Sequence, residues 1–230
     1  MNDHIIAVVP AWNEGVRIKP VLEGILTHLL VLVVDDGSHD DTVAVAESVG
    51  AAVVRHSQNR GKGAALVTGF QWALAHGYEA ALTLDADGQH DPNEIPKFVA
   101  AYENGVGDLI IGRRSFRKMP FPRPVTTPVG TWLLSMALKQ PIYDNQSGYR
   151  LYTRRCMESI KPTTTGFEFE VEVIVQAVCN GIPIGWVDIQ TIYNIDKVSY
   201  FHPVHDTVRF LRMVWRARQE RIAWEDGRQS

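Results

Sequence analysis

The sequence lacks the features by which several classes of protein are recognised. It has only two cysteines in 230 residues, too few for a disulfide framework, which predicts a reducing, cytoplasmic setting. It contains no run of about 18 uncharged apolar residues, so no membrane-spanning helix is predicted. Its first residues show neither a basic segment nor a long apolar core, and we expect no secretory signal. The net charge of −3 argues against binding of nucleic acid by bulk attraction.

The common glycine-rich nucleotide motifs are also missing. NRGKGAAL at residues 59–66 is rich in glycine and carries a lysine before a predicted helix, but it fits neither G-x-x-x-x-G-K-[ST] nor G-x-G-x-x-G. Such a segment can still present backbone N–H groups and a cation to a pyrophosphate. A tight turn that needs glycine explains the same residues, and both interpretations stay open.

The first half of the chain does contain a regular alternation of short apolar runs and segments of helical period. The predicted strands are residues 5–9, 30–34, 52–55, 80–84 and 109–112, and the predicted helices are 16–29, 40–49, 63–76 and one from about 92. This order predicts an α/β fold with a mostly parallel central sheet and helices on both faces. The polar clusters PAWNE, DDGSHDD and DADGQHD follow predicted strands, where such sheets bind ligands, so we expect one active-site cleft there.

The second half is less regular. Residues 116–128, rich in proline and cations, are expected to form a flexible loop, followed by a short apolar helix at 129–138. DNQSGYRLY is a polar turn that leads into a strand. A helix is predicted at 168–179, an extended strand at 182–193 and a basic helix at 204–221. No linker or repeat divides the chain, so residues 1–230 are expected to form one domain.

The sharpest chemical signal is DADGQH at residues 85–90. Asp85 and Asp87 follow a predicted buried strand, and Gly88 permits a turn that points both carboxylates into one cleft. Hard oxygen ligands suit Mg²⁺ or Mn²⁺, which substrate phosphates usually help to coordinate. The alternative is an acidic turn that caps the next helix. A phosphatase motif of the D-x-D-x-T type is disfavoured, because position 89 is glutamine.

A second acidic cluster, VVDDGSHDDT at residues 33–42, ends another predicted strand. Asp35 and Asp36 could accept hydrogen bonds from a uracil or guanine edge or from ribose hydroxyls. The alternative is that Ser38 or Asp40 caps the next helix while the other carboxylates are solvated. For Asp36 we favour the binding role.

In this order and spacing, PAWNE, DDGSHDDT, NRGKGAA, DADGQHDP and DNQSGYR resemble the motifs of family 2 glycosyltransferases. The chain is most similar to the branch of dolichol-phosphate mannose synthases and polyprenyl-phosphate glycosyltransferases. The resemblance implies a GT-A fold and a metal-dependent, inverting transfer of a hexose from GDP-mannose or a UDP-hexose to a polyprenyl or dolichyl phosphate. Residues 1–115 would form the nucleotide-sugar-binding half, and residues 116–230 the acceptor-binding half with a basic C-terminal helix.

The resemblance also implies roles for individual residues. The metal would neutralise the charge growing on the departing nucleoside diphosphate. The nucleotide-sugar site would contain Pro10, Trp12, Glu14, Asp36, Lys62, Asp85, Asp87 and Gln89, and Asp85, Asp87 and Gln89 would hold Mg²⁺ or Mn²⁺. The catalytic residues would be Asp87, Asp144 and Arg150. The acceptor phosphate would be bound by Arg113, Arg117, Arg150, Lys197 and Ser199.

The role expected for Asp144 depends on the acceptor. A phosphate is already ionised at neutral pH, so Asp144 would then position groups, whereas with a hydroxyl acceptor it could be the general base. It could also be only a turn residue before the strand. Glu168 and Glu170 resemble an acidic helix motif of the family, or they favour a helix N-terminus electrostatically. Single histidines are uninformative, although His90 could touch substrate.

Two further interpretations of the function stay open. The same donor chemistry could act on a soluble or protein acceptor. A nucleotidyltransferase that makes sugar nucleotides also uses a parallel sheet and metal-bound carboxylates, but it would normally carry a glycine-rich loop where this chain has PAWNEG. A non-catalytic sensor is disfavoured by Asp85, Asp87, Gln89 and Asp144.

Peripheral contact with the inner membrane face is a further hypothesis. WLLSMAL at residues 132–138 is apolar, and the predicted helix at 204–221 combines apolar residues at helical spacing with several arginines. This pattern suits a helix lying on anionic lipid. A helix packed on the domain with its charged face in water explains it equally well.

Overall fold

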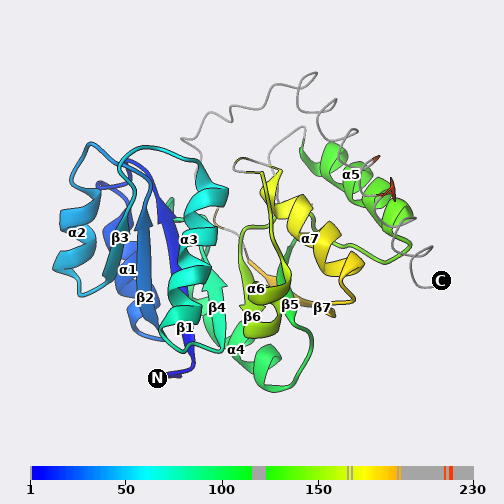
Figure 1. Ribbon diagram of the computed structural model, residues 1–230, viewed down its shortest axis with the longest axis horizontal. Helices are drawn as coiled ribbons and strands as arrows, with labels where there is room; N and C mark the ends of the chain where they lie inside the picture. The colour runs from blue at the N-terminus through cyan, green and yellow to red at the C-terminus, as the bar shows by residue number, and fades with distance from the viewer. Residues whose placement is uncertain are drawn as a thin grey trace.

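The computed structural model in Figure 1 describes residues 2–115, 123–164, 166, 168–190, 192, 215 and 218–219, without the side chains of 123–127. Its centre is a seven-stranded sheet in the order β3-β2-β1-β4-β6-β5-β7. The strands are β1 (Ile5–Ala11), β2 (Leu30–Asp35), β3 (Ala52–Arg55), β4 (Ala80–Thr83), β5 (Leu109–Arg114), β6 (Arg150–Thr153) and β7 (Ile184–Ile189). All paired strands are parallel except that β6 runs antiparallel to β4 and β5. The predicted mostly parallel sheet is therefore confirmed.

Helices cover both faces of the sheet (Figure 1). One face carries α1 (Ile18–Leu26), α2 (Thr42–Ser48) and α4 (Ile95–Glu103), which follows the short 3₁₀ turn η1 (Pro92–Glu94). The other carries α3 (Lys62–Ala75), α6 (Arg154–Ser159), α7 (Phe169–Cys179) and the end of α5 (Arg123–Leu138). Successive side chains of β1 enter opposite cores, Ile5 and Ala7 on one face and Ile6 and Val8 on the other. This two-sided burial explains why β1 is apolar throughout.

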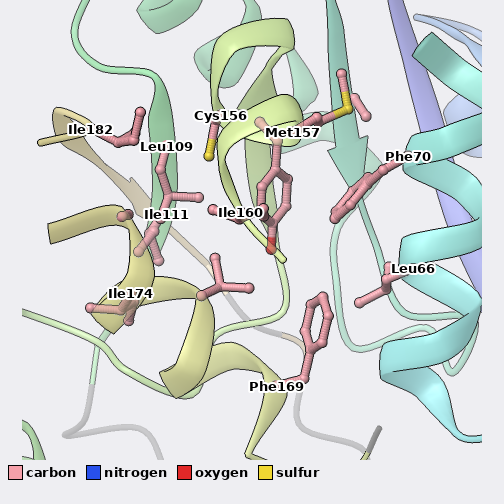
Figure 2. Packing of buried hydrophobic residues seen from close by; sticks show 14 of the residues in the cluster. Leu66, Phe70, Leu109, Ile111, Cys156, Met157, Ile160, Phe169, Ile174 and Ile182 are labelled. Carbon is pink, nitrogen blue, oxygen red and sulfur yellow. The ribbon is translucent and has the colours of Figure 1, made fainter. Parts of the chain in front are cut away.

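The larger hydrophobic core joins the two halves of the chain. Figure 2 shows Leu66 and Phe70 of α3 in the same cluster as Phe169 and Ile174 of α7. Phe70 also lies against Tyr152 of β6, with ring centroids 4.6 Å apart. Because α3 and α7 share this core, the residues at their N-terminal ends are brought to the same region of the molecule.

The second half differs from the prediction at three places. Of the proline-rich segment expected as a loop at 116–128, residues 116–122 lie outside the described residues, and the chain is helical from Arg123, with Pro128 inside α5. A content of proline and cations favours a loop, but a proline in the first turn, such as Pro124, is compatible with a helix start. The short helix α6 was not predicted. The strand expected over 182–193 is the shorter β7.

Two predicted features concern membranes. The basic helix expected at 204–221 lies outside the described residues except for Trp215, Arg218 and Gln219, which are helical. None of the helices described is long and apolar enough to cross a membrane.

Candidate active site

The polar clusters that follow β1, β2 and β4 meet around a pocket of about 370 Å³, which we call the acidic pocket. It is lined by Pro10, Ala11, Trp12, Glu14, Asp36, Asn59, Lys62, Ala65, Asp85, Ala86 and Asp87. All residues expected at the nucleotide-sugar site lie in this set except Gln89. The carboxyl ends of neighbouring parallel strands share one edge of the sheet, which is why segments so far apart in sequence converge here.

The loop after β1 is held by the loop after β2. Three backbone N–H groups of the first loop donate to side chains of the second, namely Asn13 to Ser38 Oγ (2.8 Å), Glu14 to Thr42 Oγ1 (2.9 Å) and Gly15 to Asp40 Oδ2 (3.0 Å). Ser38 and Asp40 therefore accept hydrogen bonds from the first loop. The sequence suggests only that they cap the next helix or face solvent. These contacts fix Trp12 and Glu14 at the pocket.

Asp36 lines the pocket, and the residue is only 3% exposed. Its Oδ1 accepts from His56 Nδ1 at 2.7 Å and from the backbone N–H of Arg60 at 2.9 Å, and its Oδ2 accepts from the N–H of Gly61 at 2.7 Å. His56 Nε2 lies 2.9 Å from Thr68 Oγ1 on α3. Asp36 is thus held by uncharged backbone donors and one imidazole.

The adjacent Asp35 does not line the pocket. It is fully buried, accepts from the N–H of Ser38 and lies 3.2 Å from Arg55 Nε. Of the two carboxylates considered for nucleotide binding, only Asp36 is therefore placed for it.

Lys62, the first residue of α3, connects the two halves of the site. Its Nζ lies 2.6 Å from Asp85 Oδ1 and 2.9 Å from Oε1 of the buried Glu170 on α7. Burial by itself lowers the pKa of Lys62, but the two carboxylates outweigh it and raise the pKa above its ordinary value. Burial likewise favours neutral Asp85, yet attraction to Lys62 holds the pKa of Asp85 well below its usual range. Both groups are charged at neutral pH.

Gly148, from the DNQSGYR turn, lies against this pair. A Cβ at this position would be 2.9 Å from Lys62 Nζ and 3.1 Å from Asp85 Oδ2. The absence of a side chain here leaves room for the lysine to reach Asp85.

Gln89 and His90 shape the turn that carries the acidic pair. Gly88 has a φ of 79°, which favours glycine, as the predicted turn required. Gln89 donates to both oxygens of Asp87, from its backbone N–H at 3.0 Å and from Nε2 at 2.9 Å. Buried His90 accepts from the N–H of Asp85 through Nδ1 at 3.0 Å. Burial lowers the pKa of His90, and the nearby Asp85 carboxylate offsets only part of this lowering. The ring is therefore neutral, and its Nδ1 can accept a hydrogen bond.

The donor set fits a hard divalent cation. Asp85 and Asp87 both line the acidic pocket and offer carboxylate oxygens. Within the described part of the chain, no group of three or more His, Cys, Asp and Glu residues forms a closed metal site. A cation here would therefore be completed by oxygens of a bound ligand, which is how Mg²⁺ is usually held.

A second pocket, of about 390 Å³, lies at the ends of β5 and β7, and we call it the cationic pocket. It is lined by Arg113, Arg114, Ser115, Tyr143, Asp188 and Ile189. Arg113 pairs with Asp188 through two contacts of 2.5 and 2.8 Å, and its guanidinium lies 5.2 Å from the centre of the Tyr143 ring. The side chains of Arg113 and Asp188 are 42% and 72% exposed, so water competes with this pair.

Asp144 lies behind this pocket and holds Arg114. The carboxylate is fully buried and accepts from Arg114 Nε at 2.7 Å and Nη2 at 2.9 Å. It also accepts from the backbone N–H groups of Gln146 and Ser147, both at 3.1 Å. This arrangement favours the positioning role over that of a general base.

Arg150 occupies a different place from the one expected. Its side chain is fully buried, and its guanidinium donates to the backbone carbonyls of Ser147 at 2.6 Å, Glu170 at 2.7 Å and Asn145 at 3.3 Å. It braces the DNQSGYR turn against α7 and has no surface left for a phosphate. This removes the basis for a catalytic or acceptor-binding role. Arg117, Lys197 and Ser199 lie outside the described residues.

Several residues of the two pockets were not predicted. Asn59, Tyr143 and Asp188 line them, and His56 supports Asp36. Asn59 is the first residue of the glycine-rich segment that the sequence suggests for phosphate binding, so it could have been predicted. No local pattern marks the others, because their contacts join segments that are distant in the sequence.

Comparison with known proteins identifies the family and several relatives of this chain. The model of the family described as Glycosyl transferase family 2 matches residues 6–173. Polyprenol monophosphomannose synthase of Mycolicibacterium smegmatis is 32% identical over 197 residues, which cover 78% of this chain and 74% of that protein. UDP-N-acetylglucosamine--dolichyl-phosphate N-acetylglucosaminyltransferase of Methanococcus voltae is 28% identical, with 84% and 88% covered. Undecaprenyl-phosphate mannosyltransferase of Micrococcus luteus is 29% identical, with 80% and 84% covered.

Among solved structures, glucosyl-3-phosphoglycerate synthase from Mycobacterium tuberculosis is similar in fold. Its complex with Mn²⁺, UDP-glucose and phosphoglyceric acid matches with a TM-score of 0.73 at 22% identity, covering 96% of this chain and 80% of that one. At this identity the likeness concerns the fold alone. The GT-A fold expected from the sequence is confirmed.

Proposed function

The chain belongs to glycosyl transferase family 2, and we propose that it transfers a hexose from a nucleoside-diphosphate sugar to the phosphate of a polyprenyl or dolichyl lipid. The donor would be GDP-mannose or a UDP-hexose, bound with Mg²⁺ or Mn²⁺. The observation that carries the proposal is the acidic pocket, where Asp36, Lys62, Asp85 and Asp87 converge. The names of the three relatives, each of which refers to a polyprenol, dolichyl or undecaprenyl compound, support the lipid acceptor.

The donor would lie along the acidic pocket. Pro10, Trp12, Glu14 and Asp36 would surround the nucleoside, and the carboxylate of Asp36 would accept a hydrogen bond from the base or the ribose. Lys62, at the start of α3, would meet the diphosphate together with the N–H groups of that helix end. Asp85 and Asp87 would hold the metal, with Gln89 orienting Asp87. When bound, the metal supplies Lewis-acid neutralisation of the departing diphosphate.

The acceptor phosphate would bind at the cationic pocket. Arg113, the more exposed of its two arginines, could exchange its contact with Asp188 for a phosphate oxygen. Asp144 would keep Arg114 in place. A phosphate oxygen is a nucleophile without prior deprotonation, so an inverting displacement at the anomeric carbon requires no general base in this chain.

We also propose that α5 rests on the inner membrane face. Val129, Trp132 and Met136 are large apolar residues at helical spacing and are between 53% and 59% exposed. A tryptophan beside aliphatic residues suits the boundary between headgroups and acyl chains.

Flotation with anionic liposomes tests the contact of α5 with the membrane. The wild type should float and Trp132→Ala should float less, while Val106→Ala, at another exposed valine, should not change. Equal flotation of all three would contradict the proposal.

The transfer itself is tested by product analysis. The protein is incubated with GDP-mannose, UDP-glucose or UDP-N-acetylglucosamine and vesicles that contain a polyprenyl phosphate, with Mn²⁺ or with EDTA. We expect free nucleoside diphosphate and a lipid-linked sugar from one donor series, only with metal. In a parallel incubation with 3-phosphoglycerate added, transfer to it but not to lipid would indicate a soluble acceptor, and release of pyrophosphate would indicate nucleotidyl transfer. No product with any donor would overturn the proposal.

A further inference from the structure

His56 does not line the acidic pocket, yet it contacts a residue that does. We propose that His56 is a positioning residue for the donor, which acts by fixing the carboxylate of Asp36 toward the nucleoside. The inference rests on the proposed function, since it assigns His56 to the binding of the same donor. Nothing in the sequence patterns marks this histidine.

The hydrogen bonds of Asp36 determine which acceptor position of its carboxylate remains available for a ligand. A carboxylate offers about four acceptor positions on two oxygens. Oδ1 accepts from His56 and from the N–H of Arg60, and Oδ2 accepts from the N–H of Gly61. One position on Oδ2 is therefore left among the described contacts, on a side chain that lines the pocket. A ligand at this position must donate, through an N–H of a base or a ribose hydroxyl.

The orientation of the His56 ring is fixed from both sides. A carboxylate can only accept, so Nδ1, 2.7 Å from Asp36 Oδ1, carries a hydrogen. Nε2 lies 2.9 Å from Thr68 Oγ1, and in the neutral ring it accepts the hydroxyl hydrogen. His56 is only 7% exposed, so little water competes for either nitrogen.

This network connects two parts of the donor site. Thr68 belongs to α3, whose first residue is Lys62, and Asp36 follows β2. The two backbone N–H groups already tie Asp36 to the turn before α3. The additional contact from His56 is directed at Oδ1 and adds a third donor, which narrows the rotation of the carboxylate and so the direction in which Oδ2 points. Without it, Asp36 would be held by the two backbone groups alone, and the direction of its remaining acceptor would be less sharply defined.

Two substitutions of similar size separate hydrogen bonding from packing. His56→Asn can keep a donor near the position of Nδ1, whereas His56→Leu fills the space without a donor. We expect His56→Leu to raise the donor KM and the Kd of UDP or GDP with Mn²⁺ by about 10-fold, as for loss of a hydrogen bond to a charged group. The kcat should change by less than about 3-fold, and His56→Asn should restore most of the affinity. His76→Leu, at an exposed histidine of the C-terminal end of α3, is the matched control and should have no effect.

A double-mutant cycle tests whether His56 acts through Asp36. In the Asp36→Asn background, His56→Leu should cause no further loss of nucleotide affinity, because the group it positions is already changed. Full additivity would overturn the inference, and so would equal losses of nucleotide affinity in folded His56→Leu and His56→Asn.

Should His56→Leu fail to fold, Thr68→Val carries the test, and an unchanged donor KM in that variant overturns the inference. A wild type that binds no nucleotide overturns the proposed function and this inference together, whereas wild-type binding that survives unaltered in His56→Leu overturns this inference alone.

Discussion

The acidic pocket and the cationic pocket would bind anions by opposite means. Among its described lining residues, the first contains four carboxylates, Glu14, Asp36, Asp85 and Asp87, and a single cation, Lys62. Among its described lining residues, the second contains two arginines and one carboxylate, Asp188. A diphosphate in the acidic pocket would meet an excess of negative charge, so its binding should require a divalent cation. A phosphate in the cationic pocket would meet guanidinium groups directly. Binding of the donor should therefore depend on the metal, whereas binding of the acceptor should not.

The strongest test of this comparison is Asp87→Ala. The variant should lose the metal-dependent part of donor binding, and activity should fall by about 10³-fold or more, because the metal supplies several kcal/mol of charge stabilisation. Calorimetric titration of UDP and GDP with and without Mn²⁺ measures the effect. Asp41→Ala, at an exposed aspartate near the N-terminus of α2, is the control. Unchanged donor affinity and metal dependence in Asp87→Ala would refute the assigned ligand.

On the cationic side, Arg114→Ala should mainly affect folding. It leaves the fully buried Asp144 without its bidentate partner, which should lower the free energy of unfolding by about 3–5 kcal/mol. Urea denaturation measures the change. Arg155→Ala, which breaks the exposed pair with Asp108, should cost less than about 1 kcal/mol. Similar losses in the two variants would mean that Asp144 does not depend on Arg114.

Gly148→Ala probes the position of Lys62 in the acidic pocket. The new methyl group would press on Lys62 Nζ and Asp85, and we expect the donor KM to rise by about 10-fold as the lysine shifts. The flexible end of a lysine can move aside, so the melting temperature should change little. Glu170→Gln, which weakens the other contact of Lys62, should act in the same direction. A large loss of stability with unchanged donor KM would show that Gly148 is needed only for the backbone.

The smallest effect should follow from Arg113→Ala. Because Arg113 is exposed and already paired, we expect the KM for the lipid phosphate to rise by about 5-fold, with donor affinity unchanged. Initial rates at varied acceptor concentration, with and without added salt, measure this. A change in donor affinity instead would place Arg113 in the donor site and break the division between the two pockets.

The sequence predicted the first half of the chain well because its signals are local. Each strand there ends in a polar cluster, and the edge of a parallel sheet brings these clusters together. The second half depends on contacts between distant residues. Nothing near Arg150 indicates that its guanidinium is used up by backbone carbonyls, and nothing near Asp144 indicates the pairing with Arg114. The reversed strand β6 also has no signature of its own, since direction in a sheet is set by its neighbours.

The position of β6 has a consequence for the order of events during synthesis. Strands β1 to β4 can pair as soon as residue 83 has left the ribosome, but among the described strands β5 pairs only with β6 and β7. At about 5–20 residues per second, β5 waits several seconds for residues 150–153. During that time β4 presents an open edge to which another nascent chain could add. The translation rate between β5 and β6 should therefore influence the yield of folded protein.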